Sequence, residues 1–265
     1  VRSTLTQQNS AVRDEQIVLV ADIGGGTSDF SVVRVGPERR ERLDRKSDIL
    51  ANHGVHRAGT DFDRRVELSA ILPQLGFGAM GPSRGNEPAR EVPSAVYFDL
   101  ATWHLINTVY KPQRVAELRA MRRFYANLNH HDRLLTAVTQ HLGHDLAARA
   151  EAAKILVAEG GSAAVDLGLV EAGLTVTITE RDVRQSIAAD TETIVAAAVS
   201  AVASAGLRAE QIDALYFTGG STGLRHLAEA IAQPFRAARR IDGDRFASVA
   251  TGLGLYAQRW FAPLA

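Results

Sequence analysis

The sequence predicts an α/β protein made of two bodies, and three observations lead to this prediction. Apolar residues make up 46% of the 265-residue chain, enough for the core of one large domain or two small ones. Short β-branched segments of strand length occur near both ends, and a long stretch of mainly helical periodicity lies between them. We therefore expect an α/β lobe built from 16–60 and 186–262, a mainly helical insertion with a small sheet at 61–185, and a polar extension at 1–15.

Charge and cysteine content exclude several classes of protein. Thirty basic side chains balance thirty acidic ones, so there is no basic surplus to bind a nucleic acid or an anionic membrane. The chain has no cysteine, which excludes disulfides and thiolate metal sites. No apolar run reaches about 18 residues, and the N-terminus lacks a signal-peptide pattern. We expect a cytoplasmic protein without nucleic-acid or membrane partners.

The first elements expected are three strands. Residues 16–21, Q-I-V-L-V-A, form a β-branched run of the length of a buried strand. After a glycine turn, 29–35 alternates well enough to be its hairpin partner, and a third strand is expected around 48–55. Tight turns between the strands predict an antiparallel meander within a larger sheet.

The insertion is expected to begin with a helix at 62–71, followed by a loop at 73–93 that is rich in glycine and proline. Apolar residues at three- and four-residue steps from Leu135 to Ala153 predict one continuous helix of about seven turns. The segment 162–179 returns to strand character, with a hairpin turn expected at 172–173.

The second part of the lobe starts with a helix signal. Thr179 and Asp182 have the spacing of a capping box, which predicts a helix start. Small residues at 192–205 predict a helix that ends at the following glycine. A short buried strand is expected at 212–218, and a final helix at 248–261 is expected to pack on the sheet.

Three consecutive glycines join the first two strands in D-I-G-G-G-T-S-D, residues 22–29. Glycines allow a phosphate to approach the backbone amides closely. Asp22 and Asp29 flank them and are suited to hold Mg²⁺ through water, while the Thr27 hydroxyl can donate to a phosphate oxygen. The pattern favours metal-assisted phosphoryl transfer, with an ordinary hairpin turn as the alternative. The expected phosphate ligands are Gly24, Gly25, Gly26 and Thr27.

A second glycine turn, F-T-G-G-S-T-G at 217–223, follows a buried strand and precedes a helix. Its glycines are expected to open the N-terminus of that helix, where the dipole favours a phosphate or a nucleoside hydroxyl. Strand-to-helix turns also need glycine for purely structural reasons, so this motif alone is weak. Two such turns, one near each end of an α/β body, strengthen the case for a nucleotide site.

Together these motifs resemble the actin, hexokinase and DnaK superfamily. Residues 22–29 are similar to its second phosphate-binding element, and 217–222 resemble its adenosine element. Further segments resemble the DnaK (heat shock protein 70) chaperones and follow that family's order over about 16–260. These segments are H-R-A-G-T-D-F-D at 56–63, R-A-E-A-A-K at 149–154 and I-T-E-R-D-V at 178–183.

The resemblance implies a ribonuclease H-like, actin-type ATPase lobe with a mixed five-stranded sheet, corresponding to subdomains IIA and IIB of the chaperone ATPase domain. The glycines at 24–26 would hold the phosphates of ATP or ADP, and Asp22 and Asp29 would order the waters around Mg²⁺. Asp22 and Thr27 would be the catalytic residues. The residues expected at the nucleoside are Glu151, Lys154, Gly219, Gly220 and Ser221.

The sequence departs from the family at the adenine. Ile155 and Gly223 stand where DnaK-type proteins have two arginines that sandwich the base, so guanidinium stacking would be lost there. Phe246 and Ala247 replace an acidic pair near the end of the family's pattern. Such changes are typical of divergent, YegD-like members.

The function implied is the C-terminal half of an ATP-hydrolysing domain of a DnaK-like chaperone. The first phosphate loop and the opposing lobe would precede residue 1, so we expect the isolated chain to bind nucleotide weakly and not to hydrolyse it. The partners implied are that N-terminal lobe, adenine nucleotide, and co-chaperones or unfolded protein. A sugar or small-molecule kinase of the same superfamily, or an actin-like filament module, would share the glycine turns and stays an alternative.

Overall fold

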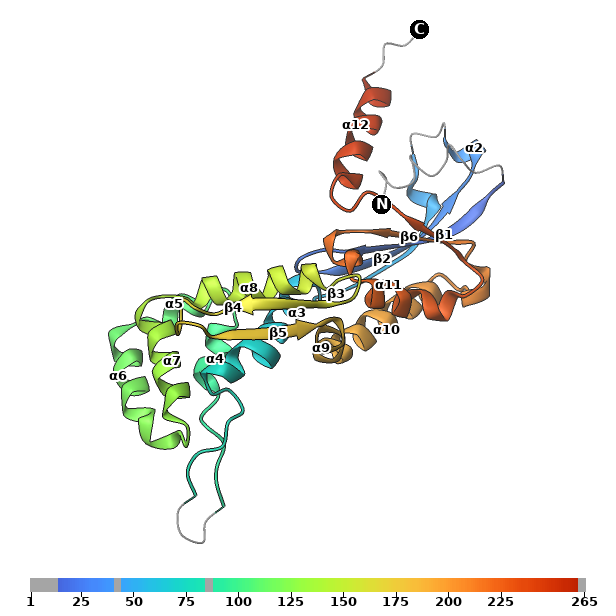
Figure 1. The fold of residues 1–265 in the computed structure, drawn as a ribbon. Coiled ribbons are helices and arrows are strands. Elements are labelled where there is room, and N and C mark those ends of the chain that lie inside the picture. The colour runs from blue at the N-terminus through green and yellow to red at the C-terminus, as the bar shows by residue number, and fades with distance from the viewer. Residues whose placement is uncertain (1–13, 41–43, 84–87, 262–265) are drawn as a thin grey trace. The chain divides into compact units, whose positions relative to one another are not determined.

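A computed structural model describes residues 14–40, 44–83 and 88–261, and the chain divides into two compact units (Figure 1). The sheet unit consists of the residues up to Thr60 together with those from Ala188 onward, and the insert unit consists of Asp61–Ile187. Of the polar extension expected at 1–15, residues 1–13 lie outside the described ranges.

A mixed sheet of five strands, in the order β3-β2-β1-β6-β7, forms the sheet unit. β1 (Gln16–Ile23), β2 (Ser28–Val35) and β3 (Ile49–Val55) form the antiparallel meander. β6 (Ala214–Thr218) pairs parallel to β1, and β7 (Arg239–Asp242) pairs parallel to β6. The α/β class and the mixed five-stranded sheet are thus confirmed.

The central strands of this sheet are apolar because both faces are covered. Val18 and Val20 of β1 belong to one buried cluster with Val33 of β2 and Tyr216 of β6. The intervening residues of β1 point to the opposite face and are also buried. Edge strand β7 reads R-R-I-D, without apolar alternation, and the strand prediction missed it for that reason.

Two helices complete the body of the sheet unit. α10 (Ala188–Ser204) packs on β2 and β3, and α11 (Arg225–Ala232) packs against α10. The α10 pattern ends as predicted, with Gly206 in the left-handed region at φ 72°. A short helix, α2 (Pro37–Arg40), follows β2.

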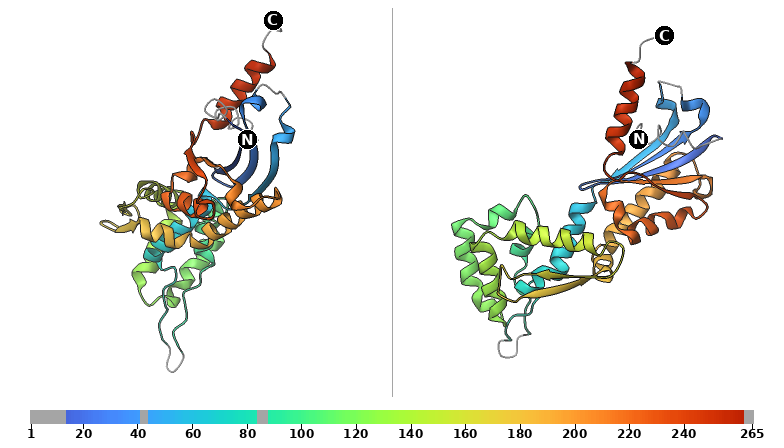
Figure 2. Two further views of the ribbon diagram at one scale, coloured as in Figure 1. Left: turned by 90° about the vertical axis from the view of Figure 1, so that its right-hand side faces the viewer. Right: turned by 45° about the horizontal axis from the view of Figure 1, so that its top comes forward.

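The last helix, α12 (Ser248–Trp260), forms where predicted and its first residue is hydrogen-bonded to Thr218 at 2.9 Å, but its exposed apolar residues do not cover the sheet. It projects from the end of the sheet in all three views of Figures 1 and 2. Val249 and Leu253, one turn apart, are 56% and 64% exposed. An apolar stripe on a helix indicates that one face needs cover, but it does not specify which surface supplies it, and this part of the prediction was wrong.

The insert unit is mainly helical and carries a two-stranded antiparallel sheet, as predicted. The first helix, α3, starts at Gly59 and passes into a π-helical turn at Glu67–Ile71. The capping box at Thr179 and Asp182 is present with both of its hydrogen bonds. The remaining bounds are α3 (Gly59–Val66), α4 (Ala95–Leu100), α5 (Ile106–Val109), α6 (Pro112–Ala120), α7 (Leu128–Thr139), α8 (Gly143–Leu156), β4 (Ser162–Asp166), β5 (Thr175–Thr179) and α9 (Glu180–Ser186).

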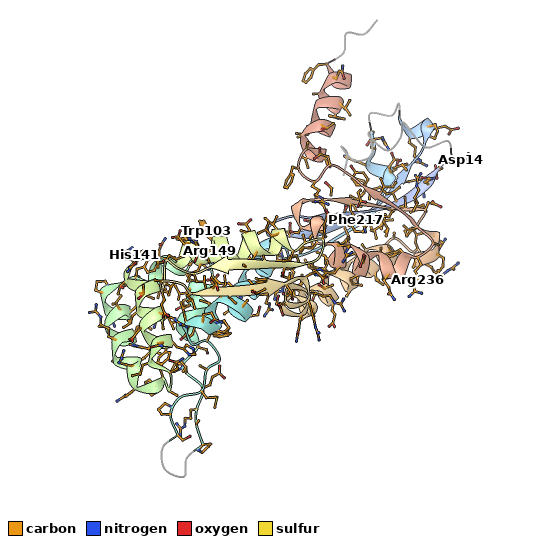
Figure 3. The ribbon with its side chains drawn as sticks, in the orientation of Figure 1. Asp14, Trp103, His141, Arg149, Phe217 and Arg236 are labelled. Carbon is orange, nitrogen blue, oxygen red and sulfur yellow. The ribbon has the colours of Figure 1, made fainter. Side chains whose placement is uncertain are left out.

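The single helix expected from Leu135 to Ala153 is two helices in the structure, α7 and α8. The chain turns at His141, labelled in Figure 3, whose φ is 59°, and Leu142 donates its amide back to the Ala137 oxygen at 2.8 Å. A left-handed residue with such a backward hydrogen bond ends a helix. Helical periodicity continues across the break, which explains why the sequence pattern concealed it.

A substitution of Gly143 tests the packing at the start of α8, directly after this break. A Cβ there would lie 2.6 Å from Ile106 Cγ2 and 2.7 Å from Tyr110 Oη, so we expect Gly143→Ala to lower the free energy of unfolding by about 1–3 kcal/mol. Gly254→Ala on α12 is the matched control, because a Cβ there meets no atom within 4 Å. Urea unfolding checks both, and equal stability of the two variants would contradict the packing described for Gly143.

Candidate functional site

The loop Gly24–Thr27, which we call the glycine loop, joins β1 to β2 and is held by its carbonyl groups. The Gly24 oxygen accepts from the Gly59 amide at 3.1 Å and from the Ser221 hydroxyl at 2.9 Å. The Gly25 oxygen accepts from the amide of Thr60 at 2.8 Å and from its hydroxyl at 2.9 Å. Both carbonyls are therefore engaged with the protein.

The amide groups of the glycine loop are left for another acceptor. Gly24 donates to the Thr27 oxygen at 2.9 Å and closes the loop. Within the described ranges, the amides of Gly25, Gly26 and Thr27 donate no hydrogen bond, and all three residues are exposed. Successive backbone N–H groups without partners form an anion-binding concavity. The loop thus offers consecutive donors to an anion.

Glycine at positions 25 and 26 is not required by the fold. Neither residue has φ in the left-handed region, and a Cβ at either position would meet no atom within 4 Å. Gly59 is different, because a Cβ there would lie 2.7 Å from Ser221 Oγ. The open space beside these two glycines would allow a ligand to come close to the backbone.

Asp22 and Asp29 lie directly opposite each other at the ends of β1 and β2. Burial, and secondly the nearby charge of Asp29, raise the pKa of Asp22. Asp29 accepts a hydrogen bond from the Thr27 hydroxyl at 2.7 Å, and Gly54 makes room for its carboxylate. Two carboxylates on facing residues are suited to hold a hydrated cation. The Thr27 hydroxyl is directed at Asp29, so its expected role at a phosphate stays a prediction.

The second glycine turn meets the first in the sheet unit. Asp22 and Thr218 are register partners in the parallel strands β1 and β6, so both turns follow the carboxyl ends of adjacent strands. Gly219 has φ 88°, and a Cβ there would lie 2.4 Å from the Ile23 oxygen and 2.7 Å from Asp22 Oδ1. Its glycine is therefore needed for conformation and for close approach. In open α/β sheets, ligands bind at such carboxyl ends.

The helix expected directly after this turn begins later than predicted. Residues Gly220–Gly223 form a 3₁₀ turn, and α11 starts only at Arg225. The glycines therefore do not open the N-terminus of the α-helix, and the helix-dipole argument does not apply to Gly220 and Ser221. Ser221 instead ties the 3₁₀ turn to the glycine loop through the Gly24 oxygen.

The sequence interpretation missed the support behind the glycine loop. Ser28 donates its hydroxyl to the Arg57 oxygen at 2.6 Å, and Arg57 forms an ion pair of 3.5 Å with the buried Asp190 of α10. Gly59 and Thr60, which bind the loop carbonyls, follow Arg57 in the chain after one intervening residue. Their segment stood out as a motif, but nothing in the sequence indicated that it contacts the loop.

Glu151 and Lys154 lie on α8 of the insert unit, which also carries Arg149 (Figure 3). Glu151 is exposed, whereas Lys154 is 7% exposed and places its ammonium 2.6 Å from Asp63 Oδ1. Burial raises the pKa of Asp63, the nearby Lys154 opposes this shift, and Glu151 adds to it. The ammonium of Lys154 thus has a partner within its own unit, and its expected role at a nucleoside stays a prediction.

The donor set of the glycine loop fits a phosphate. For a metal, the part of the chain that the structure describes contains no group of three or more His, Cys, Asp or Glu side chains that could hold an ion. Asp22 and Asp29 alone fit a cation that keeps most of its water, as Mg²⁺ does.

No known protein-family model matches the sequence. No single helix among the described residues is long and apolar enough to cross a membrane.

The glycine loop can be tested by comparing two substitutions. Gly59→Ala should displace the Ser221 hydroxyl from the Gly24 oxygen, and we expect it to lower the free energy of unfolding by about 1–2 kcal/mol. Gly25→Ala places its methyl group in open space and should stay within about 0.5 kcal/mol of the original protein. Denaturant unfolding measures both, and a larger loss for Gly25→Ala would refute the open space beside the loop.

Glu67 provides a pH test within the insert unit. Burial, with a smaller contribution from Asp63, raises the pKa of Glu67 from 4.5 to about 8. Between these values the unfolded chain releases a proton that the folded chain keeps, so stability should fall as the pH rises, by up to about 1.4 kcal/mol per pH unit. Below 4.5 both states are protonated and the group has no effect.

Glu67→Gln is the matched variant for this test, because its amide cannot ionise. The difference in free energy of unfolding between the two proteins should grow from pH 4.5 to about 8 and then level off. Urea unfolding across this range measures it. A difference that does not change with pH would show that Glu67 ionises normally.

Proposed function

We propose that the chain is a nucleotide-binding lobe in which the glycine loop holds the phosphates of ATP or ADP, as in the ATPase domain of DnaK-type chaperones. The observation that carries the proposal is the state of the loop's polar groups. The carbonyls of Gly24 and Gly25 are bound by Gly59, Thr60 and Ser221, while the next amides are free. A loop arranged in this way attracts an anion and does not attract a cation.

The simplest alternative, an ordinary hairpin turn, does not account for the glycines of this loop. A turn of that kind needs glycine where φ is positive, and Gly25 and Gly26 do not have positive φ. The open space at both positions is instead what a phosphate requires to approach the amides. The sequence order of the glycine motifs supports a nucleotide as the phosphate ligand.

Magnesium completes the proposal at Asp22 and Asp29. The raised pKa of Asp22 arises from burial and from the charge of Asp29, and a bound cation would lower this pKa by favouring the ionised carboxylate. When bound with the nucleotide, Mg²⁺ neutralises phosphate charge. The residues of this chain hold the phosphates by backbone donors and place two carboxylates beside them, which accounts for binding and orientation.

Titration with Mg-ADP tests the proposal, with amide NMR as the measurement because it detects binding even in the millimolar range. We expect the resonances of Gly25, Gly26 and Thr27 to shift and saturate. In Gly25→Asp, a carboxylate would occupy the position of the phosphate beside the amides. The affinity for Mg-ADP should then fall by at least about tenfold through charge repulsion. Gly254→Asp adds the same charge to α12 and should leave binding unchanged.

Two results would overturn the proposal. One is a folded protein whose loop amides do not move at millimolar Mg-ADP. The other is equal loss of affinity in Gly25→Asp and Gly254→Asp, which would show an effect of net charge alone.

A further inference from the structure

The most exposed large apolar side chain among the described residues lies beside the second glycine turn. Phe246 is 85% exposed, and a Cβ at Gly220 would lie 3.1 Å from its Cε1 atom. An aromatic ring that stays in solvent contributes little to the stability of the fold, and its faces are available for a ligand. Its position at Gly220 places it one residue from Ser221, which binds the glycine loop.

Hydrogen bonds of Asp244 tie the turn that carries Phe246 to the end of β6. The Asp244 carboxylate accepts from the amides of Phe246 and Ala247 at 2.8 and 2.7 Å. The Asp244 oxygen accepts from the buried hydroxyls of Thr218, at 2.9 Å, and Ser248. The backbone hydrogen bonds hold the pKa of Asp244 below its ordinary value, so this anchor stays ionised at neutral pH. The ring is therefore exposed while the backbone amide of Phe246 is held by a hydrogen bond.

A second planar group flanks the same turn. A Cβ at Gly223 would lie 2.9 Å from a terminal guanidinium nitrogen of Arg245, so the arginine lies in the space that a side chain at 223 would occupy. Guanidinium planes and aromatic rings both stack on nucleic-acid bases. Two glycines of one 3₁₀ turn thus leave room for two stacking groups contributed by neighbouring residues.

We propose that Phe246 and Arg245 form a stacking platform that determines specificity for the aromatic base of a bound nucleotide. The inference rests on the proposed function, since it requires a nucleotide whose phosphates occupy the glycine loop. The link between the two places is direct: Ser221, between Gly220 and Gly223 in the turn, donates to the Gly24 oxygen. Phe246 supplies a ring face, and Arg245 supplies both a plane and a positive charge.

The alternative occupant of Phe246 is a protein surface, because α12 continues with the exposed Val249 and Leu253. The contacts favour the base. Phe246 lies against the glycine turn at the carboxyl ends of the strands, whereas Leu253 lies about two turns farther along the helix. Leu253→Ala is therefore a matched control that removes exposed apolar surface from α12 without touching the turn.

The experiment compares Mg-ADP with Mg-pyrophosphate, which has the phosphates but no base, on the full chain by amide NMR. We expect Phe246→Ala to weaken ADP binding by about tenfold, as removal of one base-stacking aromatic does, and to leave pyrophosphate binding unchanged. Phe246→Tyr should restore ADP binding. Arg245→Lys keeps the charge and loses the plane, and it should also weaken ADP selectively.

The outcomes separate the two proposals. If pyrophosphate binds, and Phe246→Ala binds ADP as tightly as the original protein does, the stacking platform is overturned and the phosphate site is retained. An equal loss of ADP affinity in Leu253→Ala and in Phe246→Ala also overturns the stacking platform. The same holds if Phe246→Ala changes only the self-association of the protein, measured by sedimentation. Failure of both ligands to shift the loop amides overturns both proposals.

Discussion

The hydrogen bonds that engage the carbonyls of Gly24 and Gly25 are the constraint on which the site depends. A four-residue hairpin loop free in solvent would present donors and acceptors alike, with no preference for the charge of a ligand. Gly59, Thr60 and Ser221 take up the acceptors and leave the donors. Burial of Asp190 behind Arg57 fixes the segment that makes these bonds. In the proposed site, selectivity for an anion would thus be produced by residues that need not touch it.

The order of the sheet explains why distant segments converge on this loop. β1 stands between its hairpin partner β2 and the parallel strand β6, which comes almost two hundred residues later, as Ser221 and Gly24 are 197 residues apart. Adjacent parallel strands end at the same edge, so the two glycine turns become neighbours. Gly219 makes this closeness possible because a side chain there would collide with the Ile23 carbonyl.

Local sequence patterns predicted most helices and strands correctly, but they did not predict where helices break or which surfaces pack together. The strands β1, β2 and β6 and the capping box at Thr179 follow from patterns within a few residues. The break at His141 escaped prediction because the apolar period continues through it, and β7 escaped because an edge strand needs no apolar face. The placement of α12 failed because an amphipathic stripe does not identify its partner. Each of these features is determined by contacts with distant parts of the fold, which a local sequence pattern does not contain.

The candidate site divides in the same way. Glycines between two aspartates identified the loop from the sequence, because that composition has few other uses. Which polar groups of the loop remain free could not be inferred, since this depends on Ser221 and Thr60, which only the fold brings near. Phe246 is the clearest case: in the sequence it was only a departure from the acidic pair of the DnaK pattern, whereas the structure places its exposed ring in the space beside Gly220. If the stacking platform we propose exists, a change that removes one recognition group of the DnaK pattern introduces another, because a neighbouring glycine leaves room for it.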